Sequence, residues 1–450
     1  MIRYFLAFIL FPGACLAQDL IRADEVAQSF VSDKEFMGSV LVARGDHILL
    51  SKGYGSADLE WNVPNAPSTK FRLGSVTKQF TAASVLLLAE RGKLNVDAAV
   101  KKYLPDAPAA WDKITIFNLL THTSGIASFT AFSEYPSLEP FAKTPEQLVA
   151  LFRDKPLEFQ PGEKWNYSNS GYVLLGYLIE KISGEPYEKF VQENIFTPLG
   201  MKDSGYDSNA AVIVHRANGY SPTAQGPINA GFINMSIPFA AGGLYSTTED
   251  LLRWERGLFG GKLLSAASLQ KMTTPFKEDY AFGLFVRTSS GRKVIEHAGG
   301  IEGFNTHLAF YPKDQLTVIV LSNLNGGAPE SMARKLAAVA YGEPVTLQSE
   351  RKEIAVSAQL LSQRVGTYQL QPGVDMLITF EGDHLMEKLG PQPAFPIFAE
   401  SEDSFFLKVV DAQIEFGKDD SGTVAYLILH QNGHDQKAPR ISSKVELPPK

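Results

Sequence analysis

The sequence predicts an α+β protein followed by a smaller all-β domain. Strand-like stretches near residues 38–50 and 280–321 flank a middle with helical patterns. Strands at both ends with helices between them are typical of one sheet faced by helices. From about residue 363, short strand-like runs alternate with tight turns, which indicates a small barrel or sandwich. The composition is that of a globular protein, with 44% hydrophobic and 20% charged residues in a chain of 450.

The first seventeen residues have the order of a secretory signal peptide. Arg3 supplies a positive start, Tyr4–Phe11 is an unbroken apolar run, and Ala14–Ala17 offers small residues for cleavage. We therefore expect residues 1–17 to be a signal peptide and the protein to be periplasmic or secreted. A buried N-terminal helix or strand is the alternative. The apolar run is too short for a membrane span, and no later run is longer, so no integral membrane span is expected.

The cysteine content limits the covalent chemistry of the chain. Cys15 is the only cysteine, so an intrachain disulfide is impossible. Cleavage after Ala17 would leave a mature chain without cysteine, which suits an oxidising compartment. A lipid anchor on Cys15 is the second possibility, although Pro12 stands where lipoprotein signals usually carry Leu.

The charge pattern restricts the expected partners. Lys and Arg number 42 and Asp and Glu 49, which gives a net charge of −7 without any basic block. Binding of nucleic acid or of an anionic membrane therefore has no electrostatic support. His430 and His434 stand four apart beside Asp435, but no third metal ligand is evident. We expect no metal and no cofactor, and a small-molecule or peptide substrate as the partner; the oligomeric state stays open.

The first domain is expected to cover residues 18–345. Apolar, partly β-branched runs on both sides of Arg44-Gly45-Asp46 indicate a hairpin, and later runs are spaced as antiparallel neighbours. The expected strands are Gly38–Ala43, His47–Leu50, Tyr280–Val286, Lys293–Glu296, Thr306–Tyr311 and Leu316–Leu321. The expected helices are Val26–Phe30, Thr81–Arg91, Ile114–Leu120, Pro145–Arg153, Tyr172–Ile182, Tyr187–Ile195 and Ser331–Tyr341. Thr247 or Thr248 should cap a further helix.

The character of the chain changes after about Gln348. Residues 346–362 are expected to form a linker with a short helix, and residues 363–450 the all-β domain. Its strand-like runs are separated by turns such as Glu381-Gly382-Asp383 and Asp419-Asp420-Ser421-Gly422.

The segment Gly74-Ser75-Val76-Thr77-Lys78 opens an apolar, Ala- and Leu-rich helix. Ser75 and Lys78 would share one helix face, with the serine at the positive end of the helix dipole. A hydroxyl beside an amine that can accept its proton is a nucleophile candidate. Ser-x-x-Lys also occurs at Ser268, Ser290 and Ser349, and a serine at a helix start is often only a cap.

Two further motifs separate Ser75 from the other copies. Tyr167-Ser168-Asn169 is the only Tyr-x-Asn in the chain, in a polar loop before a helix. His297-Ala298-Gly299 is the only His-x-Gly, and we expect it to follow a strand and open a glycine turn. Together with Ser75 and Lys78 these motifs form an ordered triplet.

The triplet resembles that of the serine β-lactamase and penicillin-recognising family. The resemblance is to the branch of class C β-lactamases, D-alanyl-D-alanine carboxypeptidases, D-aminopeptidases and serine esterases, and it covers residues 25–342. Other blocks that look like those of the family are Gly38–Val42, Phe71–Ser75, Leu119–Gly125 and Gly242–Ser246. The tail from about residue 360 resembles the lipocalin-like β-barrel domain behind some members.

The resemblance implies a catalytic role for Ser75, Lys78 and Tyr167. Ser75 would attack a carbonyl and become acylated, and its N–H would form an oxyanion hole with that of Gly300. Lys78 would stand near Ser75 and Tyr167, and Tyr167 would act as the general base. Asn169 would hydrogen-bond Lys78 or the substrate amide.

His297 and Gly299 would lie on the substrate side of the site. β-Lactamases mostly carry Lys in the place of His297, where it binds the substrate carboxylate. A histidine is charged only in part at neutral pH, so the anchor should be weaker and strong β-lactamase activity is not expected. His122 and Thr123 are expected to brace the helical lobe.

The predicted function is that of an exported serine hydrolase that cleaves an amide or ester through an acyl-enzyme on Ser75. A peptidase or esterase is favoured over a β-lactamase. The alternatives within the class are a D-alanyl-D-alanine carboxypeptidase or D-aminopeptidase and a weak β-lactamase. The alternative of another class is a penicillin-binding sensor or scaffold without turnover.

Overall fold

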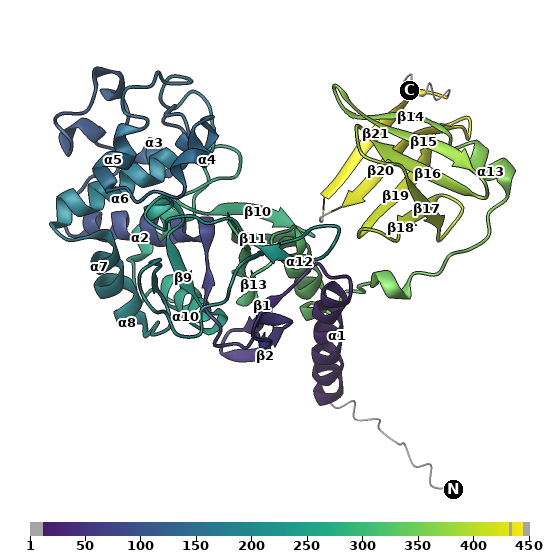
Figure 1. Ribbon diagram of the computed structural model, residues 1–450, viewed down its shortest axis with the longest axis horizontal. Helices are drawn as coiled ribbons and strands as arrows, with labels where there is room; N and C mark the ends of the chain where they lie inside the picture. Colours follow the sequence, from purple (N-terminus) through teal and green to yellow (C-terminus); the bar gives the residue numbers. More distant parts are fainter. Residues whose placement is uncertain (1–11, 432–433, 444–450) are drawn as a thin grey trace, which may run out of the picture. The chain divides into compact units, whose positions relative to one another are not determined.

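A computed structural model describes residues 12–431 and 434–443, and the chain divides into two compact units between Glu343 and Pro344. Figure 1 shows a mixed helical and sheet unit followed by a β-barrel unit. Most of the predicted signal peptide, residues 1–11, lies outside the described residues. No helix in the described part of the chain has both the length and the apolar character that a membrane crossing requires.

The first unit is built on an antiparallel sheet of six strands. Its strand order is β10-β11-β12-β13-β1-β2. The bounds are β1 (Gly38–Arg44), β2 (His47–Tyr54), β10 (Phe285–Ser289), β11 (Arg292–Ile301), β12 (Phe304–Tyr311) and β13 (Leu316–Ser322). Strands from both ends of the unit meet where β1 pairs with β13, with Ser39 opposite Leu321. The predicted sheet, made from the two ends of the unit, is therefore confirmed.

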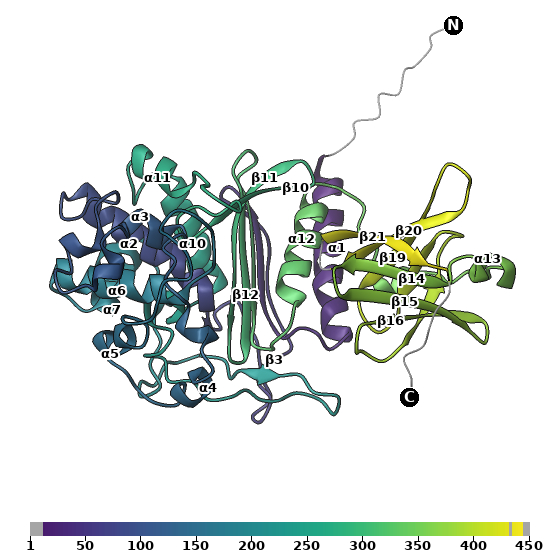
Figure 2. The ribbon, with the colours of Figure 1, turned by 90° about the horizontal axis from the view of Figure 1, so that it is seen from above.

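Helices cover both faces of this sheet (Figure 2). The helices α1 (Pro12–Ser32) and α12 (Ala328–Ala340) lie on one face. The helix α10 (Thr248–Phe259) and the 3-10 turn η1 (Gly74–Val76) pack on the other face, toward the helical lobe. Every residue of β13 is buried, which explains why its sequence is a continuous apolar run rather than an alternating one.

The helical lobe is centred on two buried helices, α2 (Thr77–Glu90) and α6 (Asn169–Ser183). The other α-helices of the unit are α3 (Ile116–Leu120), α4 (Tyr135–Leu138), α5 (Pro145–Ala150), α7 (Tyr187–Val191), α8 (Thr197–Leu199), α9 (Phe239–Gly242) and α11 (Ala266–Met272). Short turns are η2 (Val100–Lys102), η3 (Ala109–Trp111), η4 (Phe129–Ala131) and the π-helical η5 (Gln192–Phe196). Side-chain oxygens cap several starts, and Thr247 is the cap of α10, as predicted.

Three predicted strands have bounds that differ by several residues. The strand expected at His47–Leu50 continues to Tyr54. The strand expected at Tyr280–Val286 begins only at Phe285, because residues 278, 279 and 283 have positive φ and form turns. The strand expected at Lys293–Glu296 runs on to Ile301, so His297 does not open a glycine turn. Gly299 and Gly300 remain paired with β12.

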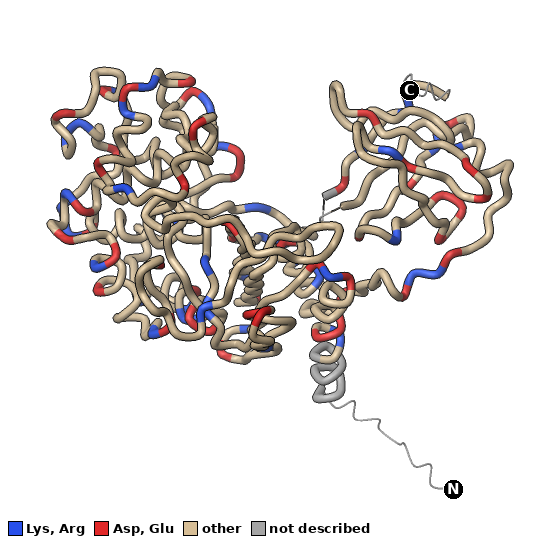
Figure 3. The backbone as a smooth tube through the Cα atoms, viewed as in Figure 1, with Lys and Arg blue, Asp and Glu red and all other residues tan. Residues whose placement is uncertain are grey.

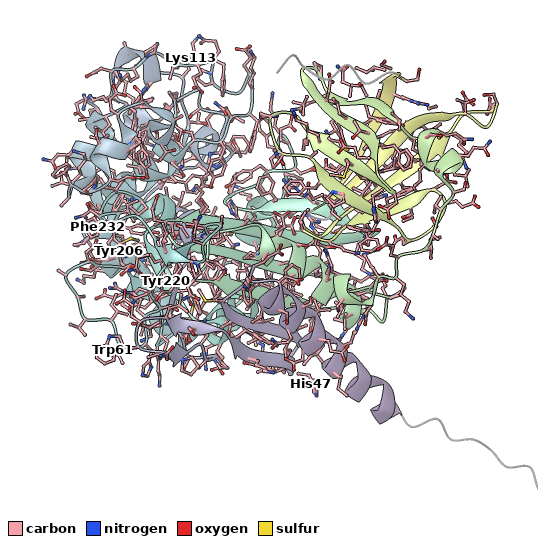
Figure 4. The ribbon with its side chains drawn as sticks, turned by 45° about the vertical axis from the view of Figure 1, so that its right-hand side comes forward. His47, Trp61, Lys113, Tyr206, Tyr220 and Phe232 are labelled. Atoms are coloured by element: carbon pink, nitrogen blue, oxygen red, sulfur yellow. The ribbon has the colours of Figure 1, made fainter. Side chains whose placement is uncertain are left out.

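Small β-elements complete the unit. They are β3 (Ser56–Asp58) with β4 (Val63–Pro64), β5 (Phe71–Arg72) with β9 (Leu244–Ser246) and β6 (Gly205–Tyr206), and β7 (Tyr220–Ser221) with β8 (Ile228–Asn229). The hydroxyl of Tyr220 accepts a hydrogen bond of 2.8 Å from the Leu59 backbone N–H, which fixes the turn between β3 and β4. Trp61 in this turn is 80% exposed (Figure 4).

The second unit is a closed eight-stranded barrel, as predicted. Its strands are β14 (Gly366–Gln371), β15 (Val374–Glu381), β16 (His384–Leu389), β17 (Phe395–Ala399), β18 (Ser404–Leu407), β19 (Ala412–Lys418), β20 (Val424–Gln431) and β21 (His434–Ser442). The turn η6 (Gln348–Glu350) and the helix α13 (Ala358–Ser362) precede it. Acidic and basic residues are interspersed along both units (Figure 3).

Candidate active site

Ser75 lies in η1, the 3-10 turn that leads directly into α2. No side-chain cap hydrogen bond is made at the start of η1 or of α2, so Ser75 is not a helix cap. The preceding Gly74 has φ +52°, a left-handed conformation that favours glycine. Ser75 is half-buried in a turn that packs on the face of the sheet, and Lys78, one turn later, is fully buried.

The Lys78 amine has three oxygen neighbours. Its Nζ lies 3.0 Å from Ser75 Oγ, 2.8 Å from Asn169 Oδ1 and 2.9 Å from the carbonyl oxygen of Ala241. Burial lowers the pKa of Lys78 well below its ordinary value of 10.5. The neutral form of the amine is thus favoured beside the Ser75 hydroxyl.

Tyr167 stands in the extended segment before α6, next to both residues. The nearby Ser75 side chain lowers the pKa of its hydroxyl, against the larger effect of burial, and Lys78 Nζ lies 4.7 Å from the centre of its ring. Burial raises the pKa of Tyr167 above its ordinary value of 10.0, so the phenol is protonated in the resting site.

Asn169 is the first residue of α6 and is held on both ends of its amide. Its Oδ1 accepts from Lys78, and its Nδ2 donates to Thr130 Oγ1 over 3.0 Å. Of the two contacts predicted for Asn169, the one with Lys78 is therefore present. The helix-capping Ser168 positions this amide at the start of α6.

The glycines of β11 allow two backbone segments to touch. A Cβ on Gly299 would stand 2.0 Å from the carbonyl oxygen of Leu73, and a Cβ on Gly74 would stand 2.8 Å from the backbone nitrogen of Gly300. The Leu73 carbonyl also accepts a hydrogen bond of 2.8 Å from Thr306 Oγ1. The peptides that carry the Ser75 and Gly300 N–H groups are consequently neighbours, as an oxyanion hole requires.

His297 differs from the prediction in its charge. It is only 3% exposed, and burial, together with the nearby Lys78, lowers its pKa to about 3. The partial positive charge expected at neutral pH is therefore absent. His297 Nδ1 lies 2.6 Å from the Ala298 carbonyl oxygen, which can only accept, so Nδ1 carries the proton. His297 Nε2 then accepts from the Tyr280 hydroxyl over 3.2 Å.

Tyr167 lies in an aromatic cluster, and only some of the members of this cluster could be identified from the sequence. Its members are His122, Trp165, Tyr167, Tyr172, Tyr280, Phe285 and His297. Tyr280 carried no sequence signal, because it lies outside every recognised motif. His122 belongs to the block Leu119–Gly125, and its predicted bracing role is confirmed by hydrogen bonds to the loop of Tyr167.

The histidines near the C-terminus belong to the barrel unit. His430 Nδ1 lies 2.7 Å from an Asp435 carboxylate oxygen in the barrel unit, and the side chain of His434 lies outside the described residues. Across residues 12–431 and 434–443, no group of three or more His, Cys, Asp or Glu residues is arranged to hold a metal ion.

Comparison with known proteins agrees with this geometry. Residues 25–342 match the Beta-lactamase family, and residues 350–440 match the Domain of unknown function (DUF3471). A penicillin-binding protein of Bacillus subtilis (strain 168) is 30% identical over 434 residues, which cover 90% of this chain and 95% of that protein.

Solved structures give the same picture. The octameric penicillin-binding protein homologue from Pyrococcus abyssi is 25% identical, with a TM-score of 0.66 over 93% of this chain and 100% of that chain. A D-stereospecific amidohydrolase from Streptomyces sp. is 28% identical, with a TM-score of 0.62 over 74% of this chain and 99% of that chain.

Proposed function

The chain belongs to the β-lactamase family, and from this premise we propose that it is an exported serine hydrolase that cleaves an amide or ester bond through an acyl-enzyme on Ser75. The observation that carries the proposal is the position of the Lys78 amine between Ser75 Oγ and two carbonyl oxygens.

The three oxygen neighbours of Lys78 would suit the three N–H donors of an ammonium as well, so the choice of the neutral amine rests on burial, which lowers the pKa of Lys78. A neutral amine has two N–H bonds and one lone pair. The Asn169 and Ala241 oxygens are carbonyls that can only accept, so they take the two N–H bonds. The lone pair is then left for the third neighbour, the Ser75 hydroxyl. Lys78, rather than Tyr167 as the resemblance implied, is accordingly assigned as the base that accepts the serine proton, because burial favours the neutral amine and the protonated phenol.

Acylation follows from this assignment. Ser75 Oγ attacks the substrate carbonyl carbon while its proton passes to Lys78 Nζ, and the carbonyl π electrons move to the oxygen. The N–H groups of Ser75 and Gly300 stabilise this oxyanion. Collapse of the tetrahedral species breaks the bond to the amine or alcohol, which leaves after it is protonated.

Tyr167 relays that proton. Its phenol is protonated and lies beside Ser75 and Lys78, so it would donate a proton to the leaving group and take up the proton that Lys78 holds. In deacylation the relay runs in reverse: water loses a proton toward Tyr167 and Lys78, attacks the acyl carbon and releases the acid. Ser75 Oγ regains its proton.

The state of His297 bears on the substrate class. Both ring nitrogens are engaged, with Ala298 and Tyr280, and the ring is neutral. A carboxylate on the substrate therefore gains no ionic anchor there. This favours a peptidase or esterase over a dedicated β-lactamase, and it also counts against a D-alanyl-D-alanine carboxypeptidase. The likeness to a D-stereospecific amidohydrolase supports a D-aminopeptidase as the alternative.

Two further parts of the proposal have their own support. Export is supported by the order of charged, apolar and small residues in 1–17 and by the penicillin-binding relative. Turnover, rather than a sensor or scaffold role, is supported by the presence of a nucleophile, a base and a proton relay within hydrogen-bonding reach.

The test is hydrolysis of p-nitrophenyl acetate by the wild type and by Ser75→Ala. We expect the variant to lose all enzymatic turnover, and Ser349→Ala, in an exposed Ser-x-x-Lys copy, to keep it. Equal rates for Ser75→Ala and wild type would refute the proposal. A panel of short esters, D-amino-acid amides, D-Ala-D-Ala peptides and cephalosporins then ranks the substrate classes.

Intact-mass measurement distinguishes the remaining alternatives. An adduct on Ser75 that forms and clears supports turnover, whereas an adduct that never clears supports the sensor or scaffold. A fluorescent penicillin should label Ser75 slowly; a rapid burst followed by fast turnover would make the protein a β-lactamase.

A further inference from the structure

His122 lies directly behind Tyr167 and contacts the chain on both sides of it. The backbone N–H of Asn166 donates to the His122 carbonyl oxygen over 3.0 Å. The backbone N–H of Ser168 donates to His122 Nδ1 over 3.1 Å. The ring centres of His122 and Tyr167 are 4.3 Å apart. The residues before and after Tyr167 are thus tied to one histidine.

The hydrogen bond from Ser168 determines the tautomer of His122. A backbone N–H can only donate, so Nδ1 presents its lone pair and the ring proton is on Nε2. His122 Nε2 is buried and has no hydrogen-bond partner among the described residues. Burial, with Lys78 and His297 nearby, lowers the pKa of His122 well below its ordinary 6.5. The ring therefore stays neutral and Nδ1 stays an acceptor.

The backbone of His122 is held in an unusual conformation. Its φ is +56°, in the left-handed region that residues other than glycine rarely occupy, and its side chain is only 1% exposed. The neighbouring peptides enforce this turn, because Thr123 N–H donates to the Asn118 carbonyl over 2.9 Å. The turn aims the His122 carbonyl and Nδ1 at the same loop.

On the basis of the serine hydrolase function proposed above, we propose that His122 is a positioning residue for the proton relay. Its carbonyl oxygen and Nδ1 hold the peptides on either side of Tyr167 and so keep the phenol hydroxyl on Ser75. Without the Nδ1 acceptor, the Ser168 N–H would be buried without a partner, and the loop would move to find one.

The test compares two substitutions that separate the acceptor from the ring. In His122→Asn the amide oxygen takes the place of Nδ1, and asparagine tolerates positive φ. In His122→Phe the ring remains and the acceptor is lost. With p-nitrophenyl acetate we expect kcat to fall roughly 10- to 100-fold in His122→Phe, with KM unchanged, and to stay within about 3-fold of wild type in His122→Asn.

Melting curves and a variant of a second buried histidine serve as controls for effects on folding. His307, on β12, is 2% exposed, and its Nε2 lies 3.3 Å from a carboxylate oxygen of Glu296. We expect His307→Phe to lower the melting temperature without a comparable fall in kcat. All rates are measured below the melting temperature and normalised to the folded fraction.

Three outcomes would overturn the positioning role. They are an unchanged kcat in His122→Phe, an equal loss in His122→Phe and His122→Asn, and a loss in kcat that follows the melting temperature across all three variants. Failure of the underlying function would look different, because the wild type itself would then show no Ser75-dependent turnover.

Discussion

Gly299→Ala tests whether the contact between β11 and the Ser75 turn sets the catalytic geometry. The added Cβ would stand 2.0 Å from the Leu73 carbonyl oxygen and 2.3 Å from Thr306 Oγ1. Ordinary van der Waals contact begins at 3.4 Å, so β11 and Leu73 would have to separate by about 1.4 Å (3.4 minus 2.0). The φ of Gly299 is not positive, so the effect is one of space and not of backbone strain.

The size of the effect follows from that separation. Leu73 is two residues before Ser75, and Gly300 is next to the substituted position. A misplacement of about 1 Å between a nucleophile and its oxyanion donors can cost about 10²-fold in rate, or roughly 2.7 kcal/mol. Overpacking should also lower the free energy of unfolding by about 1–3 kcal/mol.

The assay is kcat/KM for p-nitrophenyl acetate, followed by release of nitrophenolate, together with thermal unfolding by circular dichroism. Gly231→Ala is the matched control, because a Cβ there meets nothing within 4 Å and its φ is not positive. A Gly299→Ala enzyme that is folded and retains kcat/KM within about 3-fold of wild type would refute the close-approach argument.

Three further outcomes follow from buried charges. Because burial lowers the pKa of Lys78, kcat/KM should rise with pH through a midpoint below 10.5, and a midpoint above 10.5 would contradict this. The guanidinium of Lys78→Arg stays charged, so kcat/KM of this variant should be at least ~10²-fold lower than that of the wild type. The buried carboxylate of Asp207 lies 2.7 Å from Arg72 Nε and 2.5 Å from Arg216 Nη1. Asp207→Ala should therefore lower the free energy of unfolding, measured in urea, by about 3–5 kcal/mol. A decrease of less than ~1 kcal/mol would contradict this prediction. Glu255 is buried, its Oε2 has no hydrogen-bond partner among the residues that the structure describes, and burial raises its pKa well above 4.5. Glu255 therefore does not destabilise the fold below pH 4.5, and its destabilising effect grows as the pH rises toward the folded-state pKa. Glu255→Gln should raise the melting temperature at pH 8 but not at pH 4. Equal shifts at both pH values would be inconsistent with a titrating Glu255.

Several parts of the site could be predicted because the types of residues and their order along the chain identify them. Ser75, Lys78 and Tyr167 come together in space, and the resemblance of their ordered motifs to those of the β-lactamase family had implied this grouping. The sheet and the barrel were equally accessible, since apolar runs and turn residues repeat at regular spacing.

Other parts depend on backbone groups or on burial, which no motif records. The second acceptor of Lys78 is the carbonyl of Ala241, a backbone group 163 positions away that has no residue signal. The neutral state of His297 results from burial and from the nearby Lys78, which become visible only in the folded chain. A histidine at a strand could not be assigned a charge from its neighbours in sequence.

The extent of β11 shows how a sound rule gave a wrong bound. Paired glycines usually mark a turn, so the strand was expected to end before Gly299. Glycine inside a strand also marks a place where another backbone comes close, and this is the case here, with Leu73 against Gly299. A turn and a close approach of two backbones have the same glycine pattern in the sequence, and only the tertiary contact distinguishes them.

The pairing of β1 with β13 has a consequence for how the chain acquires activity. Ser39 faces Leu321, which is 282 positions later, so the ribosome must deliver nearly the whole first unit before this strand pair can form. Long-range pairings of this kind slow folding, because the entropy cost of closing a large loop comes before the stabilising contacts form. Until then β1 can pair only with β2, and its other edge is open to chaperones or to aggregation. Because β11 reaches β1 only through β12 and β13, the complete sheet beside the Ser75 turn can form only after these strands have been synthesised.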